Sequence, residues 1–215
     1  MAQAFLALYR STGEREWLRR ATATLDFIAG TFRHEALGFI AAPAPADAKG
    51  VFREPIRLAD HNAALVRVAN LAHRYTANER YRALAEHGMK YLTAYASASS
   101  EELRAEILLA DQEIAAAPIH ITIVGPKSDA ASRELHAAAL RYPADYLQVD
   151  WWDRSEGPLP NPEIQYPQLA RPAAFACTDN ACSTPVFEAD RVHEAVRKAL
   201  DVTSAGEQGP LTSSN

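Results

Sequence analysis

The sequence has few cysteines, no run of basic residues and no long apolar stretch, and each of these features excludes a class of protein. Its two cysteines, Cys177 and Cys182, are too few for a disulfide scaffold, and in the cytosol they would mostly stay reduced. With 22 Lys and Arg against 27 Asp and Glu residues, the formal net charge is −5, which argues against a nucleic-acid partner. No stretch approaches the roughly 18 to 20 apolar residues of a membrane span, and the N-terminus has no signal-peptide pattern. We therefore expect a cytoplasmic protein that binds neither nucleic acid nor membranes.

The first hundred residues contain an internal repeat. Residues 8–28 and 72–92 match when they are laid 64 positions apart. The matched pairs include Arg10 and Arg74, Thr12 and Thr76, Trp17 and Tyr81, Ala21 and Ala85, and Leu25 and Met89. The shared pattern is an apolar helix end, a Thr-containing turn whose polar side chains can cap free N–H groups, and a helix with apolar residues every three or four positions. The repeat predicts two helical hairpins.

The hairpins are expected to belong to a larger array. An apolar segment, Phe5-Leu6-Ala7-Leu8, begins almost at the first residue, and each repeat of such an array buries its apolar face only against its neighbours. Two hairpins alone are therefore predicted to be too few to enclose a core, and upstream hairpins or another chain would complete it. A fifth helix is expected to begin at Ser99, with Glu102 in the position of a capping box.

After Pro118 the pattern changes to an α/β unit. Short β-branched or apolar runs predict strands at 120–124, 146–149 and 173–177, a helix follows Ser128-Asp129, five prolines make 153–172 a loop, and a last helix covers about 188–200. The first two strands and the helix between them form a βαβ unit with parallel strands. The predicted fold is mainly α, with a helical-hairpin array at 1–115, a small βαβ-βα unit at 116–202 and a disordered tail at 203–215.

This order of parts resembles the C-terminal region of the YyaL-like family, which is related to the spermatogenesis-associated thioredoxin-domain protein. The phrases that carry the resemblance are Gly38-Phe39, Asp60-His61-Asn62-Ala63, Ile121-Thr-Ile-Val-Gly125 and Cys177-Thr-Asp-Asn-Ala-Cys182-Ser-Thr-Pro185-Val186. The resemblance implies an N-terminal thioredoxin-like domain and an (α/α)6 toroid similar to N-acylglucosamine 2-epimerases and six-hairpin glycosidases, of which this chain would supply the last hairpins. In the family, Gly-Phe is usually followed by acidic residues, whereas Ile40 and Ala41 follow it here.

The resemblance points to a first candidate site between residues 53 and 62, because hairpin loops and inner helix starts line the central pocket of helical toroids. There Asp60, His61 and Arg57 would act as catalytic residues, and Asn62, Glu54 and Arg53 would bind a carbohydrate-like small molecule. Two hypotheses use this site: a toroid that only binds such a ligand, and a 2-epimerase-like or glycosidase-like enzyme. The alternative is structural, with Asp60 or Asn62 capping a helix that begins near Ala63.

The two cysteines are the second candidate site. Their C-x4-C spacing is neither the C-x2-C of thioredoxin-like redox sites nor a pair of zinc-ligand doublets, and His193 is the only nearby imidazole. A turn at Asp179-Asn180 could bring the sulfurs within disulfide range. A redox or regulatory module that exchanges with the thioredoxin-like domain is therefore the third functional hypothesis, and two structural thiols are its alternative.

A third segment, 124–129, is a strand-to-helix turn that could receive a phosphate at a helix N-terminus. It lacks the three glycines of a dinucleotide fingerprint and the Gly-Lys-Ser/Thr of a P-loop, so an ordinary turn is the favoured interpretation. Trp151-Trp152 is expected to be a packed pair rather than a platform for a sugar. The other histidines, at positions 34, 73, 87, 120 and 136, fit no ligand spacing, and no metal or cofactor is predicted.

Overall fold

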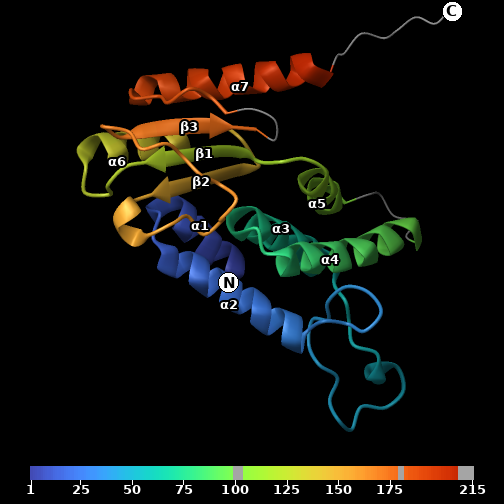
Figure 1. Ribbon diagram of the computed structural model, residues 1–215. Helices are drawn as coiled ribbons and strands as arrows, with labels where there is room; N and C mark the ends of the chain where they lie inside the picture. Colours follow the sequence, from blue (N-terminus) through green and yellow to red (C-terminus); the bar gives the residue numbers. More distant parts are fainter. Residues whose placement is uncertain (99–103, 179–181, 208–215) are drawn as a thin grey trace, which may run out of the picture. The chain divides into compact units, whose positions relative to one another are not determined.

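The computed structural model describes residues 1–98, 104–178 and 182–207 (Figure 1). The chain divides into two compact units, Met1–Ala116 and Ala117–Asn215. The first unit is helical, and the second contains a small three-stranded sheet with helices. The protein is therefore mainly α-helical with a small α/β part. In the ranges that the structure describes, no helix is long and apolar enough to cross a membrane.

The first unit contains two helical hairpins and one further helix. Its helices are α1 (Ala2–Thr12), α2 (Arg15–Thr31), α3 (Ala59–Thr76), α4 (Glu79–Ala98) and α5 (Ala105–Ala115), with a 3-10 turn, η1 (Gly50–Arg53), in the loop between α2 and α3. Gly13 and Ala77 end the first helix of each hairpin in the left-handed region, with φ of 69° and 52°. In both turns a threonine hydroxyl accepts a bond from a backbone N–H: Thr12 from Glu14 and Thr76 from Asn78. The predicted hairpins and their polar turns are confirmed.

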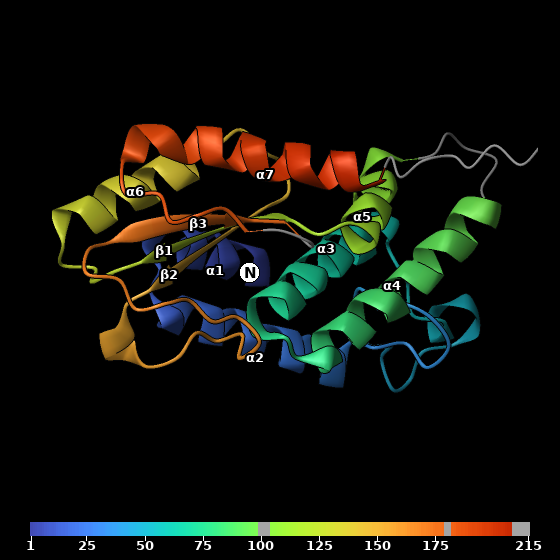
Figure 2. The ribbon, with the colours of Figure 1, turned by 45° about the horizontal axis from the view of Figure 1, so that its top comes forward.

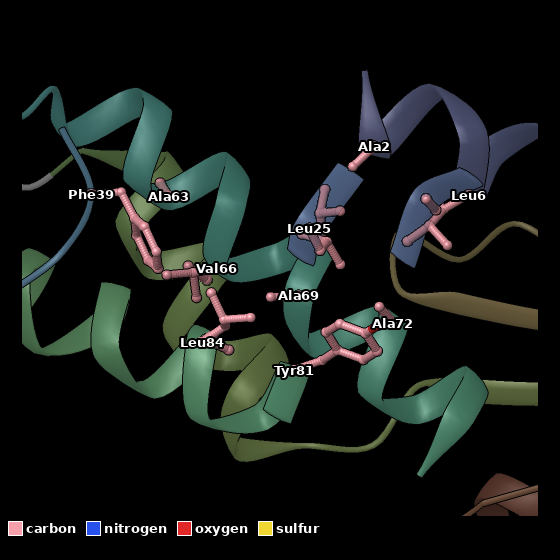
Figure 3. Packing of buried hydrophobic residues seen from close by; sticks show 14 of the residues in the cluster. Ala2, Leu6, Leu25, Phe39, Ala63, Val66, Ala69, Ala72, Tyr81 and Leu84 are labelled. Atoms are coloured by element: carbon pink, nitrogen blue, oxygen red, sulfur yellow. The ribbon is translucent and has the colours of Figure 1, made fainter. Parts of the chain in front are cut away.

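The five helices bury their apolar faces in one cluster. Figure 3 shows its centre, where Phe39 reaches from the α2–α3 loop toward Val66, and Leu25 and Leu84 lie around α3. α5 packs on α3 and adds Ile107 to the cluster. The sequence-based argument that these hairpins cannot bury their apolar faces is therefore wrong for the residues of this cluster, because the loop and α5 supply contacts that the repeat pattern does not show. Some apolar side chains do stay exposed, Leu8 and Phe27 among them.

α3 begins four residues before the predicted start. It starts at Ala59 instead of near Ala63, and Leu58 stands at the N-cap position, where no side chain accepts a bond from the helix. Asp60 and Asn62 therefore lie inside the first turns of the helix, so the interpretation that one of them caps it is wrong. The predicted start of the fifth helix at Ser99 and Glu102 lies outside the described residues, and α5 is described from Ala105.

The second unit has a mixed sheet with the strand order β2-β1-β3. Its elements are β1 (Ile119–Val124), α6 (Ala130–Leu140), β2 (Leu147–Trp152), η2 (Arg154–Glu156), β3 (Ala173–Cys177), η3 (Ala189–Arg191) and α7 (Val192–Glu207). β1 pairs with β2 in parallel and with β3 in antiparallel orientation. The predicted βαβ unit is confirmed, although its second strand continues to Trp152. α7 also continues into the segment predicted as a disordered tail, of which 208–215 lies outside the described residues.

The two faces of this sheet differ in chemistry. Figures 1 and 2 show α6 and α7 over one face, where Ile121, Val149 and Ala176 alternate toward a buried apolar cluster with Leu135 and Val196. The opposite face is mixed. It carries His120, Thr122 and Val124 of β1, Gln148, Asp150 and Trp152 of β2, and Ala173, Phe175 and Cys177 of β3. Because side chains alternate along a strand, one polar patch and one cysteine share this second face.

Candidate functional site

Asn62, predicted to bind substrate, has a structural role. Its side chain is fully buried, its Oδ1 accepts the backbone N–H of Phe39 at 2.7 Å, and its Nδ2 donates to the carbonyls of Phe39 and Leu58, both at 2.9 Å. The amide thus ties the Gly38-Phe39 segment of the α2–α3 loop to the start of α3. Because both ends of the amide are engaged with backbone groups, the geometry does not favour a ligand contact through Asn62.

Arg57 is held in a similar way. Its guanidinium donates to the carbonyl of Leu37 at 3.0 Å and lies 5.0 Å from the centre of the Tyr91 ring, a cation–π contact. The Tyr91 hydroxyl in turn donates to the backbone carbonyl of Arg57 at 2.8 Å. These contacts fix the loop against α4, so Arg57 is placed as a loop anchor.

The remaining residues of the first candidate site are exposed and do not converge. Asp60, His61, Arg53 and Glu54 all face solvent. Arg53 donates from Nε to the carbonyl of Ala48, and in the described part of the chain no hydrogen bond or ion pair joins Asp60, His61 or Glu54 to another of the predicted site residues. The structure thus offers no pair of opposed carboxylates here.

His87 is a buried titratable group of this region, and no pattern in the sequence singled it out. Its Nε2 lies 3.1 Å from the carbonyl of His34 and 3.0 Å from that of Gly38, and its Nδ1 lies 3.3 Å from a guanidinium nitrogen of Arg33. Burial, and after it the positive charge of Arg33, lower the pKa of His87 below its usual value. The imidazole is therefore a neutral donor that holds the same loop as Asn62.

The second candidate site contains a disulfide between Cys177 and Cys182. Cys177 is the last residue of β3 and is 8% exposed, whereas Cys182 is exposed. The turn predicted at Asp179-Asn180 lies outside the described residues. Beyond residue 181 the chain runs antiparallel to β3, and Ser183 donates its N–H to the carbonyl of Ala176 at 2.8 Å. The pairing that the sequence left open is thus present, and it joins a buried residue to an exposed one.

A buried polar network lies beside Cys177 on the same face of the sheet. In the strand register His120 is paired with Gln148 on one side and with Cys177 on the other, and Thr122 is paired with Asp150. The Nε2 atom of His120 lies 2.9 Å from Asp150 Oδ2 and 2.9 Å from the Thr122 hydroxyl. Gln148 also donates to Asp150 Oδ2, at 2.9 Å. Three strands therefore bring a carboxylate, an imidazole, a hydroxyl and a sulfur together.

Tyr166 connects this network to the disulfide. It comes from the proline-rich loop, and its hydroxyl donates to Thr122 Oγ1 at 2.8 Å and lies 3.9 Å from Cys177 Sγ. Burial raises the pKa of Tyr166 to about 12, so the phenol keeps its proton at neutral pH. Its ring is held between Phe175, with centroids 4.7 Å apart, and Trp152, at 6.3 Å.

The geometry of the network differs from that of a nucleophilic triad. In such a triad one imidazole nitrogen faces the nucleophile while the other faces the carboxylate. Here Thr122 and Asp150 both approach the same nitrogen, Nε2, and Thr122 is fully buried. Acyl-transfer chemistry at Thr122 is therefore not favoured. In the described ranges, no group of three or more His, Cys, Asp or Glu residues is arranged to hold a metal ion.

A groove of about 390 Å³ begins at Cys182. It runs between the segment 182–186 and the start of α7, and its charged lining residues are Glu188, Arg191, Glu194 and Lys198. Lys198 and Glu194 form an ion pair at 2.7 Å, and both are exposed. The exposed residue Cys182 thus lines a hollow together with apolar residues, Val186 and Ala195 among them, and the charged residues named above.

The third candidate, the turn at 124–129, is an ordinary strand-to-helix turn. The Asp129 carboxylate caps α6 by accepting the N–H groups of Ala131 and Ser132, so a negative group already occupies the helix N-terminus. The tryptophan pair is packed as expected: Trp151 is buried and donates to the carbonyl of Gly125, and Trp152 donates to that of Gly157.

Sequence reasoning found the cysteines but not the network next to them. A usable signal was present, since His120 and Thr122 are polar residues two apart in an otherwise apolar strand, which places both on one face. Comparison with known proteins adds no further residue: no protein-family model and no curated protein matches the chain.

Proposed function

We propose that this protein is a thiol–disulfide exchange module that acts through Cys177 and Cys182. The observation that carries the proposal is the asymmetry of the disulfide, with Cys182 exposed and lining a groove and Cys177 buried beside a hydroxyl. Exchange requires an accessible sulfur that an incoming thiolate can attack and a second sulfur that can leave. The asymmetry of the pair suits this division of roles.

A partner protein with two thiols can reduce the Cys177–Cys182 disulfide in two exchange steps. A thiolate of the partner attacks Cys182 Sγ, the S–S bond breaks, and its electron pair leaves with Cys177 Sγ, so that a mixed disulfide joins the two proteins. The second thiolate of the partner then attacks the partner's own sulfur in the mixed disulfide and releases Cys182 as a thiolate. The partner has become a disulfide and this chain a dithiol, with two protons taken up by the two cysteines. A thioredoxin-like domain, which the resemblance to the YyaL-like family implies, is the partner class that we propose.

A purely stabilising role is less suited to this disulfide. The cysteines are only five residues apart, and a cross-link of so short a loop is expected to contribute about 2 kcal/mol, compared with nearly 5 kcal/mol for a 100-residue loop. The carbohydrate-binding and glycosidase-like hypotheses are not favoured, because the Asn62 amide is bonded to the loop backbone at both ends and the Arg57 guanidinium donates to the carbonyl of Leu37.

The test uses a thioredoxin whose resolving cysteine is replaced by serine, so that a mixed disulfide is trapped. The oxidised full-length chain is incubated with this probe, and the linked peptides are identified by mass spectrometry. We expect a covalent complex through Cys182, and none with the Cys177→Ser/Cys182→Ser chain as control. Complete resistance of the folded, oxidised chain to the probe, together with resistance to wild-type thioredoxin, would contradict the proposal.

A further inference from the structure

Breaking the disulfide leaves a charge in an unfavourable place. When Cys182 is attacked, Cys177 Sγ departs as a thiolate, and Cys177 belongs to a buried cluster with Val124, Ala173 and Phe175. Burial in apolar surroundings disfavours the charged form of a thiol, and a poorly stabilised thiolate is a poor leaving group. Exchange at this site therefore needs a hydrogen-bond donor close to Cys177.

Tyr166 is placed to be that donor. Its hydroxyl oxygen is 3.9 Å from Cys177 Sγ, and its raised pKa keeps the proton on the phenol. In the oxidised protein the hydroxyl donates to Thr122 at 2.8 Å, so it already has an alternative partner in the resting state. Both acceptors lie near the same hydroxyl oxygen, so rotation about the C–O bond is the movement that would redirect the proton from Thr122 to the sulfur while the ring stays in place.

The other titratable groups on this face are engaged elsewhere. His120 is the cross-strand neighbour of Cys177 on β1, but its Nε2 atom meets Asp150 and Thr122. Asp150, on β2, accepts from His120 and Gln148 and brings negative charge, which does not stabilise a thiolate. In the part of the chain that the structure describes, no hydrogen bond joins His120 to Cys177.

We propose that the Tyr166 hydroxyl switches its hydrogen bond from Thr122 Oγ1 to the Cys177 thiolate when the disulfide is reduced. The step rests on the disulfide exchange proposed above and assigns Tyr166 as the residue that stabilises the leaving sulfur. The electron pair of the S–S bond goes to Cys177 Sγ, the tyrosine proton stays on its oxygen, and the thiolate later takes a proton from water. Thr122 is a positioning residue that holds the hydroxyl while the disulfide is intact.

The test measures the thiol pKa of Cys177 alone, in the full-length Cys182→Ser chain, from the ultraviolet absorbance of the thiolate as pH is varied. Adding Tyr166→Phe is expected to raise this pKa by roughly one unit, since a hydrogen bond to a charged group is lost. In the two-cysteine chain the same substitution is expected to slow reduction by dithiothreitol roughly three- to tenfold. Tyr142→Phe is the matched control: Tyr142 packs against His193 in the same unit, and neither readout should change.

A second variant separates the hydroxyl from the network behind it. Thr122→Val removes the resting partner of Tyr166 and keeps a side chain of similar shape, so the pKa of Cys177 should stay the same or fall. This variant also serves if Tyr166→Phe does not fold, which a thermal melt would reveal. A Cys177 pKa that is unchanged in Tyr166→Phe, or that rises in Thr122→Val, would overturn the assignment.

The two proposals fail in different ways. If thioredoxin traps Cys182 and Tyr166→Phe leaves the Cys177 pKa unchanged, disulfide exchange stands and the role of Tyr166 falls. If the native disulfide resists thioredoxin while the Cys177 pKa responds to Tyr166→Phe, the hydrogen bond exists but the exchange function falls.

Discussion

Replacing Asn62 by alanine tests whether the first candidate site is a binding site or an anchor for the α2–α3 loop. The substitution removes three hydrogen bonds, with lengths from 2.7 to 2.9 Å, and leaves the backbone N–H and carbonyl of Phe39 without this partner. A typical bond contributes about 1 kcal/mol, and a stranded buried group costs about 1–3 kcal/mol. Counting about 1 kcal/mol for each of the three bonds, and not adding the cost of the stranded groups a second time, gives a loss of about 3 kcal/mol. For a unit of this size such a loss corresponds to a fall in Tm of roughly 10 °C.

The assay is urea or thermal unfolding followed by far-ultraviolet circular dichroism. Asp60→Ala is the matched control, because Asp60 lies two residues earlier on the same helix and is exposed, and it should change stability by no more than about 0.5 kcal/mol. If Asn62→Ala is as stable as the Asp60 variant, the amide does not anchor the loop and its buried contacts have been misjudged.

Three further outcomes are expected. Gly38→Ala should destabilise the protein by more than about 2 kcal/mol in urea unfolding, because Gly38 has φ of +72° and a Cβ there would lie 2.6 Å from Tyr91 Cβ; a neutral result would mean that the loop is not packed this way. The pKa of His87 is lower in the folded than in the unfolded protein. Its contribution to stability is therefore fully present above the unfolded-state pKa near 6.5 and is lost as pH falls through the folded-state pKa. His87→Gln should flatten this part of the curve of stability against pH. Reduction of the disulfide, or Cys177→Ser with Cys182→Ser, should cost about 2 kcal/mol by the same assay, and global unfolding would contradict the short-loop argument.

The helical hairpins could be predicted because their signals are local. Thr12-Gly13 and Thr76-Ala77 both end a helix and cap the following turn, and the apolar residues of the flanking helices recur at helical spacing. The start of α3 could not be predicted in this way. Leu58, which stands at the N-cap position, is not a capping residue type. Asp60 and Asn62 are such types, but the Asn62 side chain bonds to Phe39, 23 positions away in the sequence, and not to the helix N-terminus as a cap.

The strands of the second unit could also be predicted from the sequence, but the side-chain contacts between them could not. β1 and β3 coincide with apolar runs, whereas Asp150 fell beyond the predicted end of its strand and its place in the network was missed. The contact between Tyr166 and Cys177 depends on how a proline-rich loop folds back on the sheet, for which no periodic pattern exists. Pairwise registers and loop paths are long-range properties, so the sequence could indicate the cysteines and not their surroundings.

The placement of the disulfide at the end of β3 is compatible with a sheet that holds both a stable core and the exchangeable bond proposed above. The face under α6 and α7 is apolar throughout, with Ile121 and Ile123 fully buried, and it carries the packing energy of the unit. The opposite face is therefore free to bury polar groups, provided that each is bonded, as Thr122 and Asp150 are. Because Cys177 ends its strand at the edge of that polar face, the proposed reduction of the disulfide would change the bonding of one hydroxyl, that of Tyr166, and leave the apolar face intact.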